Sequence, residues 1–436
     1  MSKQDHELRD PIHVFVRLTS DERRVVDSRP FQRLRHIHQL AMTSMLYPAA
    51  THKRFEHSLG VMELAGRVFD VVTKRDNVVD EVRRIIPEID DSDGLRYWKR
   101  AVRMAALCHD IGHLPFSHAA EKDLLPADWN HERLTRELIL SREMADIWDA
   151  MTPPLRALAV VKLAIGQKEA PDLEFSTWQT ILSEIIVGDS FGVDRMDYLL
   201  RDSYHVGVPY GRFDHFRLID TLRILPLAES GSGEPALGVE EGGLRSAEAL
   251  LLGRYYMYSQ VYFHPIRRIY DIHLKDFLSA WLPGHFSTDI ESHLRRTDNE
   301  VLSAISIAAL DPDLPGHDPA RRIARHDHYK LLYQRYPDDV RKNPAFGAVL
   351  LSAAQEQFGS DAVRRDAYKQ KRDATRFPVR LPDERIDFAT SHSDVLSSLP
   401  VVTVDFLYIR PDLLDEARRW FEAGRKKLLK KRPKEE

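Results

Sequence analysis

The chain has 436 residues, of which 43% are hydrophobic and 30% charged; this composition excludes a disordered tract, a collagen-like repeat and a membrane bundle. Its 63 Lys and Arg against 67 Asp and Glu give a formal net charge of −4, so no global basic field recruits nucleic acid. The single cysteine, Cys108, excludes an internal disulfide framework, and the opening MSKQDHELRD lacks the apolar core of a signal peptide. We expect a cytoplasmic globular protein with no membrane contact and only weak, local contacts with nucleic acid.

The first half of the chain has the apolar spacing of helices. After an extended segment over residues 10–18, Thr19 and Glu22 have the spacing of a capping box, which predicts a short helix. Apolar residues then recur at helical intervals over 31–40, from about 56 to 69, and from about 95 to 109.

The second half is more mixed. Five glycines and one proline within 229–243 predict a small hairpin, and a long helical stretch over 244–282 is expected to divide at Pro265. One strand is predicted over 399–409, followed by a helix from Asp412. We therefore expect a mainly α fold: a helical domain over 1–300 with a small β-hairpin, and a smaller C-terminal α+β lobe over 301–436 that ends in a basic tail.

Three histidines and a carboxylate fall within ten residues, from His109 to His118, at the end of an apolar helix. Taken alone, such histidines often satisfy carbonyl groups and the dipole at a helix terminus. However, His57 lies upstream in a second motif, THKRFEHSLG, and Asp194 lies downstream in GDSFGVD. Two imidazoles and two carboxylates suit a borderline divalent ion, and the order His57, His109-Asp110, Asp194 is typical of the metal site of the HD superfamily.

Three blocks carry a closer resemblance: FQRLRHIHQL at 31–40, YPAATHKRFEHSLG at 47–60 and HDIGHLPFSH at 109–118. They closely resemble the deoxynucleoside triphosphate triphosphohydrolases (dNTPases) of the HD superfamily. The resemblance covers about residues 10–285 and is loose in the C-terminal lobe, and we see no counterpart of the sterile-alpha-motif domain of the animal members. It implies metal-dependent hydrolysis of dNTPs to deoxynucleoside and inorganic triphosphate.

The resemblance also implies roles for individual residues. The metal ligands would be His57, His109, Asp110 and Asp194. His131 would be the general acid, held by Glu121 where the family has Asp, and His113 would contact the phosphate under attack. The remaining phosphate-pocket residues would be His118, which lines the phosphate or ribose pocket, and Arg54, Arg195 and Arg254, with Arg195 at a position where the family commonly has Lys.

Sugar selection and regulation are implied in the same way. The residues that hold the 3′ hydroxyl and press on the 2′ carbon would be Gln39, Leu40, Tyr198, Asp202 and Tyr262. Asp27, Gln32 and Arg35 match residues that read guanine in an activator site between subunits, which favours a homotetramer or dimer of dimers. Against strong activation, the family's cationic positions fall near Glu240 and Glu241 and at Pro265; taken alone, the three activator residues also fit a salt-linked helix start.

Several alternatives stay open at this point. The metal is Fe, Mn, Ni, Zn, Co or Mg, with additional Mg accompanying the nucleotide, and the base preference is not encoded in any motif. A second hypothesis is another HD phosphohydrolase: a nucleotidase, a pyrophosphatase, or a phosphodiesterase or nuclease. A third, of another class, is a nucleotide-sensing or nucleic-acid-binding oligomer, although such a protein would not need the ligand quartet.

Overall fold

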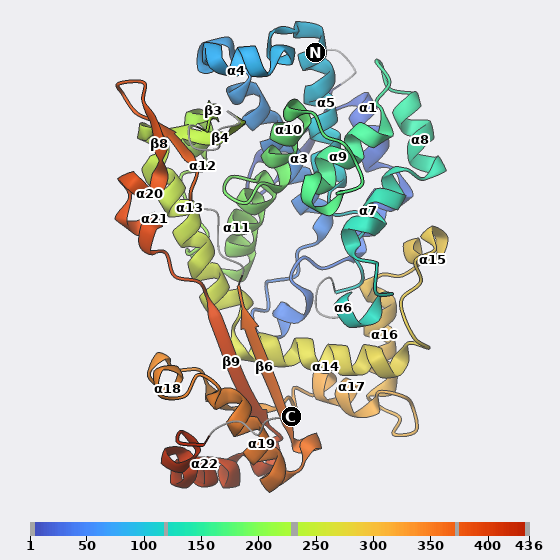
Figure 1. The fold of residues 1–436 in the computed structure, drawn as a ribbon. Helices are drawn as coiled ribbons and strands as arrows, with labels where there is room; N and C mark the ends of the chain where they lie inside the picture. The colour runs from blue at the N-terminus through green and yellow to red at the C-terminus, as the bar shows by residue number, and fades with distance from the viewer. Residues whose placement is uncertain (1–4, 117–120, 228–233, 371–374, 432–436) are drawn as a thin grey trace. The chain divides into compact units, whose positions relative to one another are not determined.

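Figure 1 shows the computed structural model, which describes residues 5–116, 121–227, 234–370 and 375–431. The fold is mainly α, as predicted, with small sheets. Two compact units are formed, and neither is continuous in sequence. The first comprises Met1–Met257, His285–Asn299 and Asp373–Pro400, and the second comprises Tyr258–Gly284, Glu300–Arg372 and Val401–Glu436.

This division differs from the single boundary that we expected at residue 300. The helix α14 (Pro265–Trp281) packs on α17 (His317–Ala324), so it groups with the second unit. Conversely, strands β7 (Pro378–Arg380) and β8 (Ile386–Phe388) join the sheet of the first unit. Tertiary pairing of this kind leaves no mark in local composition.

The core of the first unit is a group of helices around α3 (Arg54–Val72). This helix packs against α5 (Ser92–Cys108) and α11 (Val193–Val206), and α10 (Thr177–Val187) packs on α9 (Ala157–Glu169) (Figure 1). The end of α5 that approaches the core is lined by fully buried Ala101, Ala105 and Ala106. The two helices predicted over 56–69 and 95–109 are thereby confirmed, with slightly wider bounds.

The N-terminal expectations are confirmed in part. Strand β2 (Val14–Thr19) pairs antiparallel with β1 (Asp5–Asp10), and Thr19 and Glu22 form the predicted capping box of α1 (Ser20–Val26). The helical spacing over 31–40 was wrong beyond residue 36. There α2 (Arg29–Arg33) and a 3₁₀ turn (Leu34–His36) end at Ile37, which is extended and accepts a hydrogen bond from Arg54 N.

The predicted hairpin is present as antiparallel strands β3 (Leu222–Pro226) and β4 (Pro235–Glu240). Strand β7 pairs parallel with β4, which completes a four-stranded sheet in the order β3-β4-β7-β8. The expected division near Pro265 is also present: α13 (Leu244–Met257) is followed by a π-helical turn (Tyr258–Tyr262), and α14 has Pro265 in its first turn.

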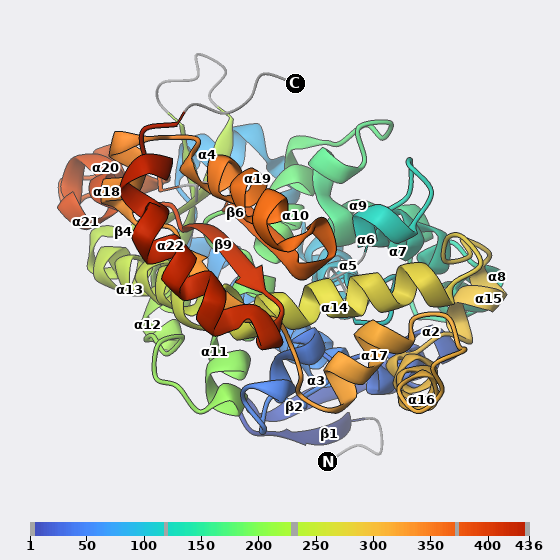
Figure 2. The same cartoon turned by 90° about the horizontal axis from the view of Figure 1, so that it is seen from below.

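The second unit is built on a three-stranded antiparallel sheet, β5-β9-β6. The predicted strand is its centre, β9 (Thr403–Ile409), and its neighbours β5 (Lys330–Gln334) and β6 (Val363–Lys369) were not expected. Leu407 and Ile409 belong to one core cluster with residues of α19 (Phe346–Phe358) and α22 (Leu414–Leu428). Figure 2 shows these two helices beside β6 and β9. Phe406 and Tyr408 pack on Ile269 of α14, so the period-two alternation of β9 buries both faces of the sheet.

The remaining helices are short and connect these layers: α4 (Asp80–Ile85), α6 (Glu121–Leu124), α7 (His131–Ile139), α8 (Arg142–Asp149), α12 (His215–Thr221), α15 (Ile290–Leu294), α16 (Asp298–Ala308), α18 (Pro337–Lys342), α20 (Ala389–His392) and α21 (Asp394–Ser398). Among the described residues, no helix combines the length and the apolar character that crossing a membrane requires.

Candidate metal centre

The four predicted metal ligands lie together in the first unit. His57 comes from the first half of α3, His109 and Asp110 from the turn that ends α5, and Asp194 from the first turn of α11. His57 Nε2 lies 3.0 Å from Asp194 Oδ1 and 3.7 Å from Asp110 Oδ2, and His109 Nε2 lies 3.5 Å from Asp194 Oδ1. Two nitrogens and two carboxylates thus converge on one point.

The protons on the two imidazoles follow from their other contacts. His109 Nδ1 lies 2.8 Å from the carbonyl oxygen of Ala106, which only accepts, so Nδ1 carries the proton. His57 Nδ1 likewise lies 2.9 Å from the Asp197 carboxylate. Both Nε2 lone pairs are left for the cluster, and His109 Nε2 is buried with no hydrogen-bond partner in the described part of the chain. This donor set fits a borderline divalent ion.

The electrostatics favour a cation at the same point. Burial lowers the pKa of His57, but its hydrogen bonds to Asp194 and Asp197 outweigh burial and raise the pKa to about 10. Burial alone would raise the pKa of Asp194, yet the two histidines hold it below its usual range. The carboxylates therefore stabilise positive charge between the imidazoles, whether that charge is a proton or a metal ion.

A buried network behind His57 was not found from the sequence. Asp197, one turn after Asp194 on α11, accepts hydrogen bonds from His57, from His13 Nε2 at 2.7 Å and from Arg201 Nε at 2.8 Å. Arg201 also reaches Asp10 at 2.8 Å. A Cβ on Gly60 would lie 1.9 Å from Asp197 Oδ1, so only glycine fits there. The helical spacing of Asp194, Asp197 and Arg201 was the available signal.

His131, the predicted general acid, begins α7 and is held by carboxylates. Its Nδ1 lies 2.8 Å from Glu121 Oε1 and 3.1 Å from Glu132 Oε2, so the longer Glu121 still reaches the ring. The His131 ring stacks on His113 with 4.0 Å between centroids. Burial opposes charge on both rings, but the glutamates raise the pKa of His131, whereas Arg54 and His131 add to burial in lowering the pKa of His113. The environment thus favours the charged form of His131 and the neutral form of His113.

The predicted phosphate and sugar residues of the first unit form several contacts. Arg54 is buried and hydrogen-bonded to Asp110, and Arg254 Nε donates to the Tyr198 hydroxyl at 3.3 Å. Asp202 Oδ1 lies 2.7 Å from His52 Nε2, a partner that the sequence did not suggest. Leu40 is buried and follows Gln39 in the sequence, and Arg195 follows Asp194 on α11.

Two predicted residues fall outside this description. Tyr262 belongs to the π-helical turn of the second unit, and His118 lies outside the described residues. Their roles stay predictions.

Two of the three predicted activator residues are in contact with each other. Arg35 Nε donates to Gln32 Oε1 at 2.9 Å, and the Arg35 guanidinium lies 3.6 Å above the Phe55 ring. Asp27, which follows α1, accepts from Arg23 Nε at 2.9 Å. These contacts fit the salt-linked alternative as well as a binding patch, so the activator role stays a prediction.

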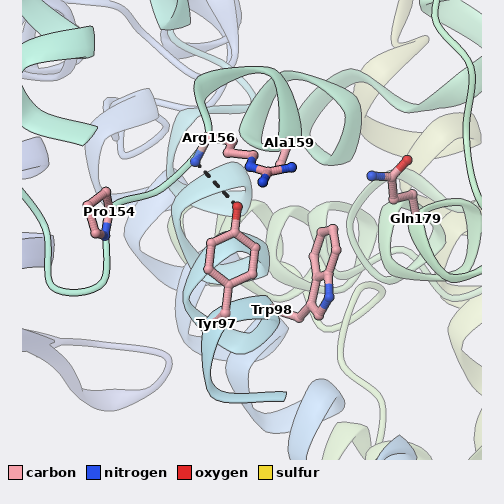
Figure 3. A pocket seen from close by; sticks show the side chains of 6 residues that line it. All are labelled: Tyr97, Trp98, Pro154, Arg156, Ala159 and Gln179. Carbon is pink, nitrogen blue, oxygen red and sulfur yellow. Dashed lines mark hydrogen bonds between the residues drawn. The ribbon is translucent and has the colours of Figure 1, made fainter. Parts of the chain in front are cut away.

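A surface hollow of about 410 Å³ in the same unit contains none of the predicted site residues (Figure 3). It is lined by Tyr97, Trp98, Pro154, Arg156, Ala159 and Gln179, and the Tyr97 hydroxyl accepts a hydrogen bond from Arg156 N at 3.3 Å. Because α5 rises by about 1.5 Å per residue, Trp98 and His109 are roughly 16 Å apart along the helix. The hollow is therefore not the metal centre.

Comparison with known proteins agrees with this geometry. The model of the HD domain matches residues 54–172, and that of the HD associated region matches residues 213–348. A solved structure of a hypothetical protein from Aquifex aeolicus is 32% identical, with a TM-score of 0.76, and the match covers 95% of this chain and 99% of that one.

Curated relatives are longer. The uncharacterized protein YwfO of Bacillus subtilis (strain 168) is 32% identical over 309 residues, 66% of this chain and 62% of that protein. The deoxynucleoside triphosphate triphosphohydrolase SAMHD1 of Gallus gallus is 29% identical over 372 residues, 77% of this chain and 57% of that protein. The chain thus spans less than two thirds of these relatives. An HD domain is followed by its associated region, and the predicted ligand residues gather at one buried point. The chain therefore belongs to the HD superfamily, and within it the chain is similar to proteins named dNTPases.

Proposed function

We propose that this protein is a metal-dependent phosphohydrolase that converts dNTPs to deoxynucleoside and inorganic triphosphate. The observation that carries the proposal is the convergence of His57, His109, Asp110 and Asp194 beside the stacked pair His113 and His131. The similarity to relatives that are named deoxynucleoside triphosphate triphosphohydrolases supports this substrate over other phosphate esters.

A divalent ion held by the four ligands supplies Lewis-acid polarisation of a phosphate oxygen and makes water more acidic. His57 and His109 contribute neutral Nε2 donors, because Asp197 and the Ala106 carbonyl hold the protons on their Nδ1 atoms. Asp197 thereby fixes the orientation of the His57 ring. The four ligands thus bind the ion, and Asp197 holds one of them in place.

His131 supplies the proton that the reaction consumes. Water adds to the α-phosphorus, the bond from the α-phosphorus to the 5′ oxygen breaks, and that oxygen needs a proton to leave as an alcohol. Glu121 and Glu132 hold His131 Nδ1, which leaves Nε2 as the donor, and their charge raises the pKa of His131 and so favours the protonated ring. The attacking water loses a proton in the same reaction, so the reaction releases as many protons as it consumes.

Three arginines are proposed to bind the triphosphate, and a separate group of residues is proposed to bind the sugar. A triphosphate carries about four negative charges, so Arg54, Arg195 and Arg254 have an electrostatic role in binding it.

Gln39 Oε1 is buried without a hydrogen-bond partner in the described part of the chain, which suits an acceptor for a sugar hydroxyl. Leu40, Tyr198 and Tyr262 are proposed to exclude a ribose hydroxyl. Asp27, Gln32 and Arg35 are proposed to bind a guanine nucleotide in a homo-oligomer.

The test is chromatography of the products formed from each dNTP and NTP with several divalent metals. We expect deoxynucleoside and triphosphate in equal amounts, and little turnover of NTPs. Release of monophosphate and pyrophosphate, or of orthophosphate, would instead identify another HD phosphohydrolase. A His109→Ala/Asp110→Ala variant that keeps full metal occupancy would contradict the ligand assignment.

A further inference from the structure

Three polar side chains outside the predicted site form a line of short hydrogen bonds in the first unit. Lys53 Nζ lies 2.5 Å from His38 Nε2, and His38 Nδ1 lies 2.6 Å from Asp298 Oδ2. The Asp298 side chain is 0% exposed and that of His38 is 14% exposed. A buried carboxylate needs partners that compensate for its lost hydration, and this one has several.

Both oxygens of Asp298 accept hydrogen bonds from N–H groups. Oδ2 accepts from His38 N at 2.7 Å as well as from the ring, and Oδ1 accepts from Phe116 N at 2.8 Å. Since His38 Nδ1 donates to a carboxylate, Nε2 of the neutral ring is an acceptor, and Lys53 donates to it. Asp298 therefore joins three segments that are far apart in the sequence.

The first two segments are residues 37–39 and the start of α3. His38 pairs with Lys53 in an isolated antiparallel bridge, Gln39 N donates to His52 O at 3.0 Å, and Arg54 N donates to Ile37 O at 3.0 Å. This pairing aligns Gln39, which belongs to the proposed sugar pocket, with Arg54, which belongs to the proposed phosphate pocket.

The third segment is the loop from Asp110 to Phe116, which carries His113. Phe116 has a positive φ of 56°, a left-handed conformation that is strained for a residue with a side chain. Asp298 holds its N–H, and the Phe116 ring lies parallel to His38, with an interplanar angle of 5° and 6.0 Å between centroids. Arg33 braces the same loop, because Nη1 donates to His113 O at 2.8 Å and Nε donates to Arg296 O at 2.9 Å.

We propose that Asp298 is a positioning residue that, through His38 and the N–H of Phe116, holds Gln39 and His113 in register on the two walls of the substrate pocket. The inference rests on the proposed function for what the pocket binds. Asp298 contacts no proposed metal ligand among its recorded partners, so its loss should disturb the alignment of substrate and leave the metal in place.

The test compares four variants of the full chain for metal content, melting temperature, kcat and KM. Asp298→Asn places an amide where three N–H donors meet one carboxylate, so its NH₂ group faces a donor. We expect kcat to fall by about 10- to 100-fold, the scale of a misplacement near 1 Å. His38→Ala should lose activity in the same way. His38→Asn, whose amide N–H replaces Nδ1–H, should recover most of it. The control is Asp339→Asn, which removes an equally buried carboxylate from the second unit, bound there to Arg425 at 2.8 Å.

Metal occupancy equal to wild type, with a fall in kcat that Asp339→Asn does not share, supports the proposal. Wild-type kcat and KM in Asp298→Asn would overturn it, as would loss of metal or the lack of any recovery in His38→Asn. If the wild type hydrolyses no dNTP, the proposed function fails, and hydrogen exchange then tests the positioning role alone. The Phe116 amide should exchange faster in Asp298→Asn than in wild type or Asp339→Asn; equal rates would overturn the role.

Discussion

At the residue scale, the clearest feature is that two stacked imidazoles have opposite charge preferences. Glu121 and Glu132 outweigh burial and raise the pKa of His131 above its usual 6.5, while burial and Arg54 lower that of His113. A ring that must give a proton benefits from the first environment, and a ring that contacts phosphate as a neutral donor benefits from the second. The assignment of acid to His131 therefore has a physical basis besides the motif.

We expect His131→Ala to retain metal and nucleotide but to lose turnover by roughly two to four orders of magnitude, the usual contribution of a positioned acid. In the wild type, kcat should fall as pH rises through the raised pKa of His131, because the ring must be protonated. Glu121→Gln removes the strongest raising contact and should move this fall to lower pH. Single-turnover rates across pH measure both effects.

Glu121→Asp is the matched control, because it keeps the negative charge. In this variant kcat should fall at a higher pH than in Glu121→Gln. A His131→Ala enzyme with a nearly unchanged single-turnover rate would exclude the acid role.

A second residue-scale prediction concerns Asp197, which orients His57 from behind. Asp197→Asn should weaken metal binding by about 10- to 100-fold, the usual cost of losing such a partner. The control is Asp366→Asn, which breaks a similar buried pair with Arg268 in the second unit. Breaking either pair should lower the free energy of unfolding by about 3–5 kcal/mol. Titration against a metal-binding dye separates them: equal metal affinity in the two variants would show that Asp197 has only a structural role.

At the element scale, α7 packs against the turn that carries the proposed metal ligands His109 and Asp110. Thr135 Oγ1 accepts from Gly112 N at 3.1 Å and donates to His109 O at 3.2 Å. A Cβ on Gly112 would lie 2.3 Å from both His131 O and Thr135 N. The close approach of the turn and α7 therefore requires glycine, and it sets the distance between His131 and the metal ligands.

We expect Gly112→Ala to push α7 away and to lower kcat by about 100-fold, because His131 moves by the order of 1 Å. Metal content should stay near that of wild type. Gly424→Ala in α22 is the control: its Cβ would meet nothing closer than 3.8 Å, so activity should be unchanged and the helix slightly more stable. Loss of metal in Gly112→Ala would mean that the turn, rather than α7, had moved.

Local chemistry explains which elements the sequence revealed. The capping box of Thr19, the division at Pro265 and the strand that became β9 each depend on residues that are close together in the sequence, and each is present. Strands β7 and β8 have three residues each and are defined only by the neighbours that they pair with. Ile37 leaves the helical pattern because a distant segment, at Arg54, offers a better partner for its carbonyl.

The same distinction applies to the site. The ligand quartet and the His131 pair were predictable because short motifs carry them. Asp197 reaches His57 and His13, and Asp298 reaches Phe116, across more than 100 residues of sequence. The spacing of Asp197 and Arg201 indicates a local ion pair, but it does not indicate these distant partners. Long-range partners of this kind require the folded chain.

At the scale of the whole molecule, assembly and regulation depend on the charges available to a second nucleotide. Gln32 and Arg35 are hydrogen-bonded to each other on the first unit, and Asp27 is paired with Arg23. The hairpin position that carries cations in the family has Glu240 here. Arg223 Nη2 and Arg380 Nη2 lie 3.0 and 2.5 Å from Glu240 Oε1, so this glutamate balances cations of the same sheet. Those arginines are consequently engaged, and a bound triphosphate would have to compete with Glu240 for them.

We therefore expect a homotetramer or dimer of dimers with at most modest activation by a guanine nucleotide. Activity that needs residues from two subunits should rise with protein concentration, and a nucleotide that bridges subunits should shift the same equilibrium. Light-scattering mass and initial rates, measured with and without dGTP, test both parts. Arg35→Ala should abolish whatever activation exists, whereas Arg17→Ala, an exposed arginine paired with Glu7, should leave it unchanged. A monomer at micromolar concentration under every condition would contradict the assembly, and a large dGTP-dependent rise in rate would show that the missing cations matter less than the patch around Arg35.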